Sequence, residues 1–125
     1  MNILIIEDDP IDMKLFSAVL KADDHHVFEE SSAEQALEAL KTHHPEVILL
    51  DLKLPGMDGL ALARRLKQHP ATRNIPIVAI TAAREKFSKE AALKAGCDAY
   101  IVKPVDTRNL SRQIVGAAAY QVRPA

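Results

Sequence analysis

The sequence predicts an α/β protein in which a five-stranded parallel sheet is covered by five helices on both faces. Short strand-like runs alternate along the chain with segments of helical period. Several of these runs are apolar throughout, which is typical of strands that are buried on both faces of a sheet. The connections between runs are short, so strands and helices are expected to join through right-handed crossovers.

The first strand is expected at Asn2 to Ile6, where no residue after Asn2 is polar. Asp9 is the predicted N-cap of the following helix. Pro10 fits the first helical position, where a missing N–H breaks no hydrogen bond. Four apolar residues at helical spacing are expected to form the buried stripe of this helix: Ile11, Leu15, Ala18 and Val19.

A second, weaker strand is expected at residues 26–30, and the capping box of residues 32–35 begins a helix that His43-His44-Pro45 stops. The run that begins at Val47 and ends on Asp51 supplies the third strand. After it, Pro55-Gly56 suits the centre of a type II turn, and Asp58 can cap a third helix that ends before Pro70.

The fourth strand is expected at Ile77 to Thr81, followed by an alanine-rich helix from Glu85 to Ala95 that Gly96 closes. Ala99 to Val102 reads as a short fifth strand. Asp106 can then cap a last helix that contains Leu110, Ile114 and Ala117. We expect residues 1–120 to form one domain and residues 121–125 a short tail, with no effector domain attached.

Composition excludes several classes of function. The net charge of −1, from 16 basic and 17 acidic residues, gives no basic surface for direct DNA binding or for an anionic membrane. No apolar stretch approaches the about 20 residues that a membrane-spanning helix needs, so no membrane insertion is expected.

Cys97 is the one cysteine and is expected to be buried. A single cysteine, together with the missing signal peptide, suits a protein of the reducing cytoplasm. The pairs His25-His26 and His43-His44 lack metal-ligand spacing and are expected to face solvent.

Polar residues interrupt the apolar runs at one recurring place, the carboxyl end of each strand. Glu7 and Asp8 end the first strand, Asp51 the third, Thr81 the fourth and Lys103 the fifth. Parallel strands present their carboxyl ends at one edge of a sheet, where ligands of such folds bind. Each residue alone is common at a strand end, but together they predict a site of three carboxylates, a hydroxyl and an ammonium.

This group of residues fits phosphoryl chemistry with a divalent cation. Three neighbouring carboxylates repel one another and cannot all stay ionised in a half-buried cleft unless a cation lies among them. Oxygen ligands favour Mg²⁺, and a carboxylate beside a metal can act as a nucleophile toward phosphorus. Lys103 and Thr81 could then stabilise charge on the phosphoryl oxygens.

At these residues the sequence resembles the response regulator receiver family of two-component signalling. The resemblance covers nearly the whole chain, through the stretches "ILIIEDD", "VILLDLKLPGMDG", "IPIVAITA" and "AGCDAYIVKP". It implies the flavodoxin-like strand order 2-1-3-4-5, for which a member of this family is a known example. It also implies a signalling protein that catalyses only its own phosphoryl transfer and slow self-dephosphorylation.

The resemblance implies a role for each site residue. Asp51 is the expected phosphoacceptor, and Lys103 would contact the phosphoryl group. Mg²⁺ would be held by Asp8, Asp51 and the backbone carbonyl of Lys53, with Glu7 acting through water. Two further features are implied by the family: a cis peptide before Pro104, and a switch made of Thr81 and Tyr100.

The resemblance also implies partners. The phosphoryl donor would be a sensor histidine kinase or a histidine phosphotransfer protein. Thr81 and Tyr100 would change the face made by the fourth helix, the fifth strand and the fifth helix, which would contact a downstream protein target. The chain is expected to be a monomer or a weak, phosphorylation-dependent dimer.

Lys53 and Ala83 occupy positions beside the expected path of a water that would attack the phosphoryl group. An acid or an amide at either position could orient this water, whereas alanine cannot, and lysine could pair with the phosphoryl oxygens or hinder access. Slow self-dephosphorylation is therefore expected.

Three other classes of protein share parts of this pattern. An aspartate-nucleophile phosphohydrolase needs a second aspartate two positions after the first, where this chain has Lys53. A flavodoxin-type electron carrier needs a Ser/Thr/Gly-rich phosphate loop, where this chain has the acidic "EDDP". A pseudo-receiver, which is never phosphorylated, would lack a site residue, and none is missing.

Overall fold

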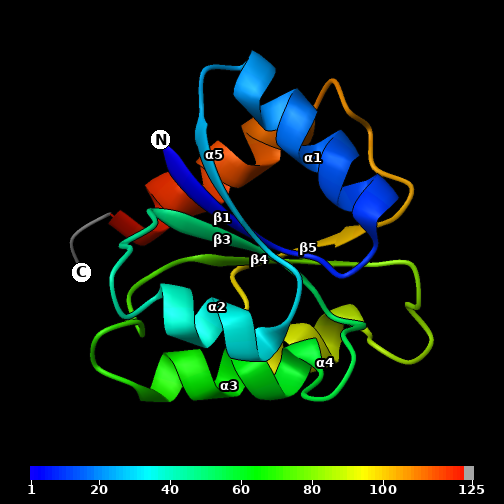
Figure 1. Cartoon of the computed structure of the whole chain (residues 1–125). Coiled ribbons are helices and arrows are strands. Elements are labelled where there is room, and N and C mark those ends of the chain that lie inside the picture. Colours follow the sequence, from blue (N-terminus) through cyan, green and yellow to red (C-terminus); the bar gives the residue numbers. More distant parts are fainter. Residues whose placement is uncertain (123–125) are drawn as a thin grey trace.

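A five-stranded parallel sheet lies between two layers of helices (Figure 1). The computed structural model describes the backbone of residues 1–122 and the side chains of residues 1–119. The strands lie in the order β2-β1-β3-β4-β5, as predicted. Their bounds are β1 (Asn2–Ile6), β2 (His26–Glu30), β3 (Val47–Asp51), β4 (Ile77–Thr81) and β5 (Ala99–Val102).

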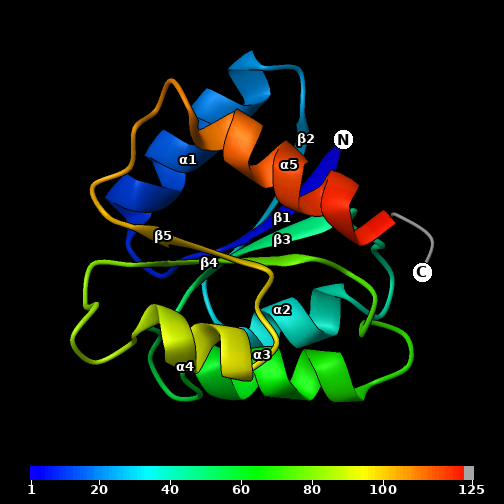
Figure 2. The same ribbon diagram turned by 180° about the vertical axis from the view of Figure 1, so that it is seen from behind.

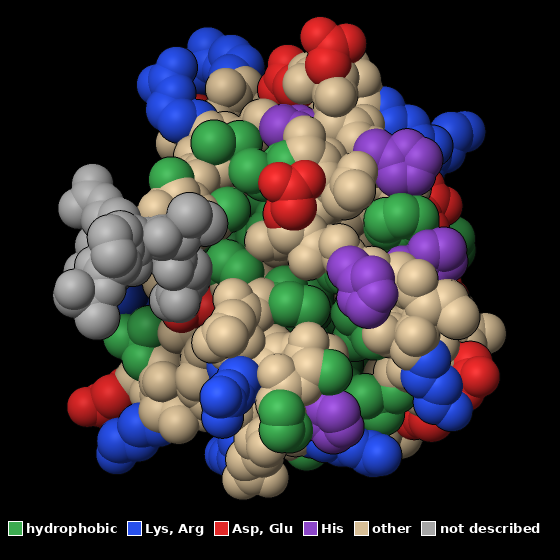
Figure 3. Space-filling view, turned by 90° about the vertical axis from the view of Figure 1, so that its left-hand side faces the viewer, with side chains coloured by type: hydrophobic (Ala, Val, Ile, Leu, Met, Phe, Trp, Pro, Cys, Tyr) green, Lys and Arg blue, Asp and Glu red, His purple; other side chains and the backbone are tan. Residues whose placement is uncertain are grey.

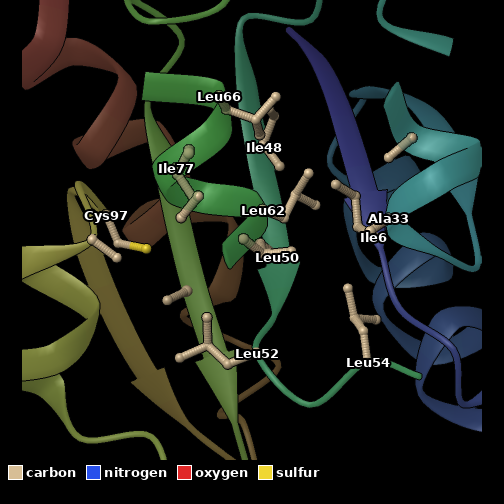
Figure 4. Close-up of a cluster of buried hydrophobic side chains, with 14 of the residues drawn as sticks. Ile6, Ala33, Ile48, Leu50, Leu52, Leu54, Leu62, Leu66, Ile77 and Cys97 are labelled. Atoms are coloured by element: carbon tan, nitrogen blue, oxygen red, sulfur yellow. The ribbon is translucent and has the colours of Figure 1, made fainter. Parts of the chain in front are cut away.

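Helices α1 (Pro10–Ala22) and α5 (Leu110–Val122) cover one face of the sheet. The opposite face is covered by α2 (Ala33–Ala39), α3 (Gly59–Gln68) and α4 (Lys89–Lys94), as Figure 2 shows from behind. Alternate residues of each strand enter the two cores: Ile3 and Ile5 pack toward α1 and α5, and Leu4 and Ile6 pack toward the other layer. Figure 4 shows the second of these cores. The five residues of β3 and the five of β4 are all buried, which explains their apolar runs.

The predicted helix starts are confirmed where a side chain caps the helix. The Asp9 carboxylate accepts hydrogen bonds from the backbone N–H groups of Ile11 and Asp12. Ser32 and Asp58 cap α2 and α3 in the same way. Gly56 has φ +71° and Gly96 has φ +103°, values that favour glycine and match the predicted turn and helix end.

The predicted buried stripe of α1 is wrong. Ile11 is 77% exposed and Leu15 is 42% exposed. The residues that α1 buries are Met13, Phe16, Ser17 and Leu20. Both sets have helical spacing, so the period does not say which set faces the sheet. Packing against the sheet and α5 decides this, and it turns Phe16 and Leu20 toward the core.

Helix α4 begins at Lys89 and not at Glu85, because Ser88 is its N-cap and accepts a hydrogen bond from the backbone N–H of Ala91. Helix α2 ends at Ala39, earlier than predicted, and its last residues continue as turns. Asp106 accepts a hydrogen bond from the backbone N–H of Arg108 in a turn that precedes α5.

Residues 121–122 belong to α5, and residues 123–125 of the expected tail lie outside the described residues. No helix within residues 1–122 has the length and apolarity to cross a membrane.

The histidines gather on the face of the molecule shown in Figure 3. His26, His43 and His44 are exposed, as predicted. His25 differs, because it is half-buried, with its Nε2 2.7 Å from the Ser111 hydroxyl and its Nδ1 3.1 Å from the Met1 ammonium. Two of these histidines pack on one aromatic ring: His43 stacks on Phe28 at a centroid distance of 4.5 Å, and His26 meets the same ring edge-on at 4.8 Å.

A mostly buried ammonium fastens α3 to the amino-terminal edge of the sheet. Lys67 Nζ donates to the carbonyl of Ile75 at 2.7 Å and lies 3.3 Å from Asp98 Oδ2. The same Asp98 oxygen accepts from the N–H of Ile77, the first residue of β4, at 2.8 Å. Gly96 is needed here for space as well, since a Cβ at this position would lie 2.6 Å from Lys67 Cγ. Neighbouring Cys97 is buried, and burial raises the pKa of its thiol to about 12, so the thiol stays protonated at neutral pH.

We predict that Lys67→Met lowers the free energy of unfolding by about 1–3 kcal/mol, because it removes the ion pair with Asp98 and the hydrogen bond to the half-buried carbonyl of Ile75. Urea unfolding followed by circular dichroism measures this loss. The matched control is Lys41→Met, since Lys41 pairs with Glu38 at side-chain exposures of 70% and 75%. The control should change stability by about 0.5 kcal/mol or less. Equal midpoints for both variants would contradict the structural role of Lys67.

Candidate functional site

The carboxylates and the ammonium predicted to meet do meet at the carboxyl edge of the sheet, whereas the Thr81 hydroxyl bonds to the backbone N–H of Ala83. Glu7 and Asp8 follow β1, Asp51 closes β3, Thr81 closes β4 and Lys103 follows β5. The register aligns these strand ends, because Ile6 of β1 is paired with Leu50 of β3, the residue before Asp51. The prediction that these side chains come together is therefore confirmed for the carboxylates and the ammonium described next.

Three carboxylates form an acidic cluster. One oxygen of each of Glu7, Asp8 and Asp51 lies within 4.8 Å of the others. Glu7 and Asp51 are buried, whereas Asp8 is exposed. Oxygen donors at this spacing fit a hard divalent cation such as Mg²⁺, and the exposed side at Asp8 leaves room for the water ligands that Mg²⁺ retains.

The Lys103 ammonium binds two of these carboxylates and a third one from α1. Its Nζ lies 2.9 Å from Glu7 Oε1, 2.9 Å from Asp51 Oδ2 and 2.8 Å from Asp12 Oδ2. It also lies 5.7 Å from the centre of the Phe16 ring. Burial opposes the charged ammonium, but the three carboxylates outweigh burial and raise the pKa of Lys103 above its ordinary value.

Asp12 is the residue that sequence reasoning missed. It belongs to none of the motifs that carry the family resemblance, and an acid in the first turn of a helix is ordinarily explained by a favourable interaction with the helix dipole. The available signal was its place one helical turn after Asp8, since the helix begins directly above the strand ends.

The carboxylates carry more negative charge than one ammonium balances. Burial raises the pKa of Glu7 well above its usual range, the neighbouring Asp51 raises it further, and Lys103 only partly opposes this. A divalent cation beside Glu7 and Asp51 would remove the repulsion. The electrostatics of the site therefore fit a bound Mg²⁺.

Asp51 is held at both of its oxygens. Oδ1 accepts a hydrogen bond of 2.9 Å from the backbone N–H of Lys53, and Oδ2 accepts the bond from Lys103. The side chain is nearly buried, with the residue 4% exposed. The carboxylate is therefore presented in one orientation by the loop that follows β3.

Gly59 keeps this loop close to the start of α3. Its N–H donates to the carbonyl of Leu52 at 2.9 Å. A Cβ at Gly59 would lie 2.5 Å from Leu52 Cα and 2.8 Å from the carbonyl oxygen of Asp51. Only glycine fits between the helix and the backbone next to Asp51.

Thr81 and Tyr100 both contact the segment that joins β4 to α4. The buried Thr81 hydroxyl accepts a hydrogen bond of 2.9 Å from the N–H of Ala83. The Tyr100 hydroxyl donates to the carbonyl of Phe87, and burial raises the pKa of this phenol. Their action as a switch stays a prediction. The cis peptide predicted between Lys103 and Pro104 is confirmed.

Comparison with known proteins gives the family. Residues 3–115 match the family model described as the response regulator receiver domain. The chain is a member of the response regulator receiver family. It is thus a receiver domain of two-component signalling.

Curated relatives and solved structures agree with this assignment. The receiver is 36% identical over 104 residues to the polar-differentiation response regulator DivK of Brucella ovis, which covers 83% of this chain and 85% of that protein. It resembles the receiver domain of a sensor histidine kinase from Pseudomonas aeruginosa, with a TM-score of 0.86 and 28% identity over 94% of this chain and 97% of that one. That crystal structure holds a magnesium ion in its active-site cleft. A CheY-like receiver domain protein from Methanospirillum hungatei has a TM-score of 0.87 and 27% identity, over 96% of this chain and 94% of that one.

We predict that Gly59→Ala destabilises the receiver by about 1–3 kcal/mol, because the added methyl overlaps the backbone beside Asp51. Gly116→Ala is the matched control, since a Cβ at Gly116 in α5 would meet nothing within 4 Å. This control should stabilise the protein by about 0.5–1 kcal/mol through helix propensity. Thermal and urea unfolding of both variants test the difference in sign. A Gly59→Ala protein as stable as the parent would contradict the close approach.

Proposed function

We propose that this receiver accepts a phosphoryl group on Asp51 from a histidine kinase or a histidine phosphotransfer protein, in a reaction that depends on Mg²⁺. The observation that carries the proposal is the setting of Asp51, whose carboxylate is buried, held at both oxygens and surrounded by Glu7, Asp8 and Lys103. A cytoplasmic location, where such donors have their phosphohistidine, is part of the same proposal.

In the proposed reaction, a carboxylate oxygen of Asp51 attacks the phosphorus of the donor phosphohistidine. The bond between phosphorus and the imidazole nitrogen breaks, its electron pair stays on the nitrogen, and Asp51 becomes an acyl phosphate. Lys103 then donates to a phosphoryl oxygen. The Thr81 hydroxyl, which accepts from Ala83, can donate its proton to another phosphoryl oxygen once it turns toward the phosphoryl group.

The metal site is proposed to consist of Asp8, Asp51 and the backbone carbonyl of Lys53, with Glu7 acting through water. Mg²⁺ bound there would neutralise charge on the phosphoryl oxygens during transfer. The acidic cluster and its excess negative charge support this ligand set. The magnesium ion in the cleft of the Pseudomonas aeruginosa receiver domain gives further support.

The output is proposed to be a change in protein–protein contacts at the face formed by α4, β5 and α5. A Thr81 hydroxyl that turns toward the phosphoryl group gives up its bond from Ala83, at the start of the segment to which Tyr100 is tethered through Phe87. A shift of this segment would move α4 relative to β5. The partner at this face would be a downstream protein target, and the receiver itself a monomer or a weak dimer that depends on phosphorylation.

We predict that acetyl phosphate with Mg²⁺ adds one phosphoryl group to the receiver, and that Asp51→Asn abolishes this addition, because an amide is a poor nucleophile. Chelation of Mg²⁺ should slow labelling by about tenfold or more. Intact-protein mass spectrometry measures the added group.

Asp24→Asn is the control for Asp51→Asn, because Asp24 is exposed and has φ +65°, a conformation that asparagine tolerates well. This variant should label like the parent. Phosphate on another residue, or continuous turnover of a generic phosphate ester, would contradict the proposal, and the second result would favour a phosphohydrolase.

We also infer that the phosphoryl group on Asp51 is lost slowly. Hydrolysis needs a water that attacks phosphorus, so that the bond to Asp51 breaks and inorganic phosphate leaves. The methyl group of the half-buried Ala83 can neither orient nor deprotonate this water.

We predict that Ala83→Glu shortens the lifetime of the phosphorylated receiver by about tenfold to a hundredfold, because its carboxylate can accept a proton from the attacking water. The lifetime is measured after rapid removal of the donor. Ala82→Glu is the neighbouring control, since residue 82 is exposed, and it should leave the lifetime unchanged. A parent lifetime of only seconds that Ala83→Glu fails to shorten would count against slow hydrolysis.

A further inference from the structure

Asp12 accepts a hydrogen bond from the Lys103 ammonium, which the proposed reaction needs for the phosphoryl group. A lysine ammonium has three N–H donors and no acceptor. In this receiver Nζ of Lys103 has three carboxylate partners at 2.8–2.9 Å, and Asp12 is one of them. A phosphoryl oxygen can obtain a hydrogen bond from Lys103 only if one of these partners releases its own.

Asp12 differs from the other two partners of Lys103. Glu7 and Asp51 belong to the acidic cluster, and the cation-binding group found among residues 1–122 does not include Asp12. Its carboxylate comes from α1 and is 29% exposed, whereas the side chains of Glu7 and Asp51 are 0% and 5% exposed. Asp12 therefore adds negative charge near Asp51 and accepts one hydrogen bond from the ammonium, but it lies outside the acidic cluster.

We propose that Asp12 is a positioning residue that competes with the phosphoryl group on Asp51 for the Lys103 ammonium. This inference rests on the proposed phosphorylation of Asp51. The Asp12 and Asp51 oxygens bond to the same nitrogen, so they lie within two hydrogen-bond lengths of each other. At this separation a fixed carboxylate also repels an incoming anion. Asp12 thus weakens phosphoryl binding in two ways, by occupying an N–H of Lys103 and by its charge.

If Asp12 served only to stabilise α1, its removal would not change phosphoryl binding through Lys103. An acid in the first helical turn stabilises the helix through the helix dipole, with or without a contact to Lys103. Asp9 offers the matched comparison, because it carries the same charge at the same helix end but caps α1 through backbone N–H groups and has no bond to Lys103. Asparagine caps helices as well as aspartate does, so Asp9→Asn removes the charge and keeps the cap.

The test measures the affinity of beryllofluoride, a mimic of the phosphoryl group, for the full chain with saturating Mg²⁺ by fluorine NMR. Asp12→Asn should bind beryllofluoride about threefold to tenfold more tightly than the parent, since a partly exposed ion pair and one like charge are removed. Asp9→Asn should stay within about twofold of the parent, and Asp12→Glu, which keeps the charge and reaches Lys103, should resemble the parent.

A second measurement asks whether Asp12 acts through Lys103. In a Lys103→Met background the gain from Asp12→Asn should shrink to the part that comes from its charge alone. A double-mutant cycle detects this coupling, which a purely structural role would not produce. Unchanged or weaker binding by Asp12→Asn, or an equal gain from Asp9→Asn, would overturn this inference. A parent protein that binds no beryllofluoride at all would instead overturn the proposed phosphorylation, so the two failures are distinguishable.

Discussion

The sharing of one ammonium by three carboxylates is the interaction on which the site of this receiver depends. Glu7, Asp12 and Asp51 come from separate elements, and Lys103 holds them together across the edge of the sheet. Carboxylates placed this close raise one another's free energy when ionised. The buried apolar strands β1 and β3 supply the packing that keeps them in place. The resulting excess of negative charge is what the proposed binding of a divalent cation would neutralise.

The two edges of the sheet use buried lysines for opposite purposes. At the amino-terminal edge, Lys67 has its charge matched by Asp98 and its remaining N–H groups directed to carbonyls, so that edge is electrostatically complete and stabilises the fold. At the carboxyl edge, Lys103 has more acidic partners than it can neutralise. The length of the strands thereby separates the lysine that stabilises the fold from the lysine that belongs to the proposed phosphorylation site.

Much of the fold was predictable because its signals are local. Strand bounds follow from runs of apolar residues, and the starts of α1, α2 and α3 follow from caps that act within three residues. The meeting of Glu7, Asp8, Asp51 and Lys103 was also predictable, since parallel strands bring their carboxyl ends to one edge, but the contact of Asp12 with Lys103 was not. Prediction of a helix start failed where composition and capping disagree. Glu85 to Ala95 has a helical composition throughout, but Ser88 is the N-cap and α4 therefore begins only at Lys89.

The sequence by itself determined which elements form, in what order, and which polar residues end the strands. The tertiary structure alone decided how α1 is rotated against the sheet, so that Phe16 is buried and Ile11 is exposed. The same rotation brings Asp12 to Lys103, a contact between residues far apart in the chain. The physical reason is that helical periodicity fixes the spacing of side chains around the helix axis, whereas packing against β1, β2 and α5 sets how far the helix is rotated about that axis.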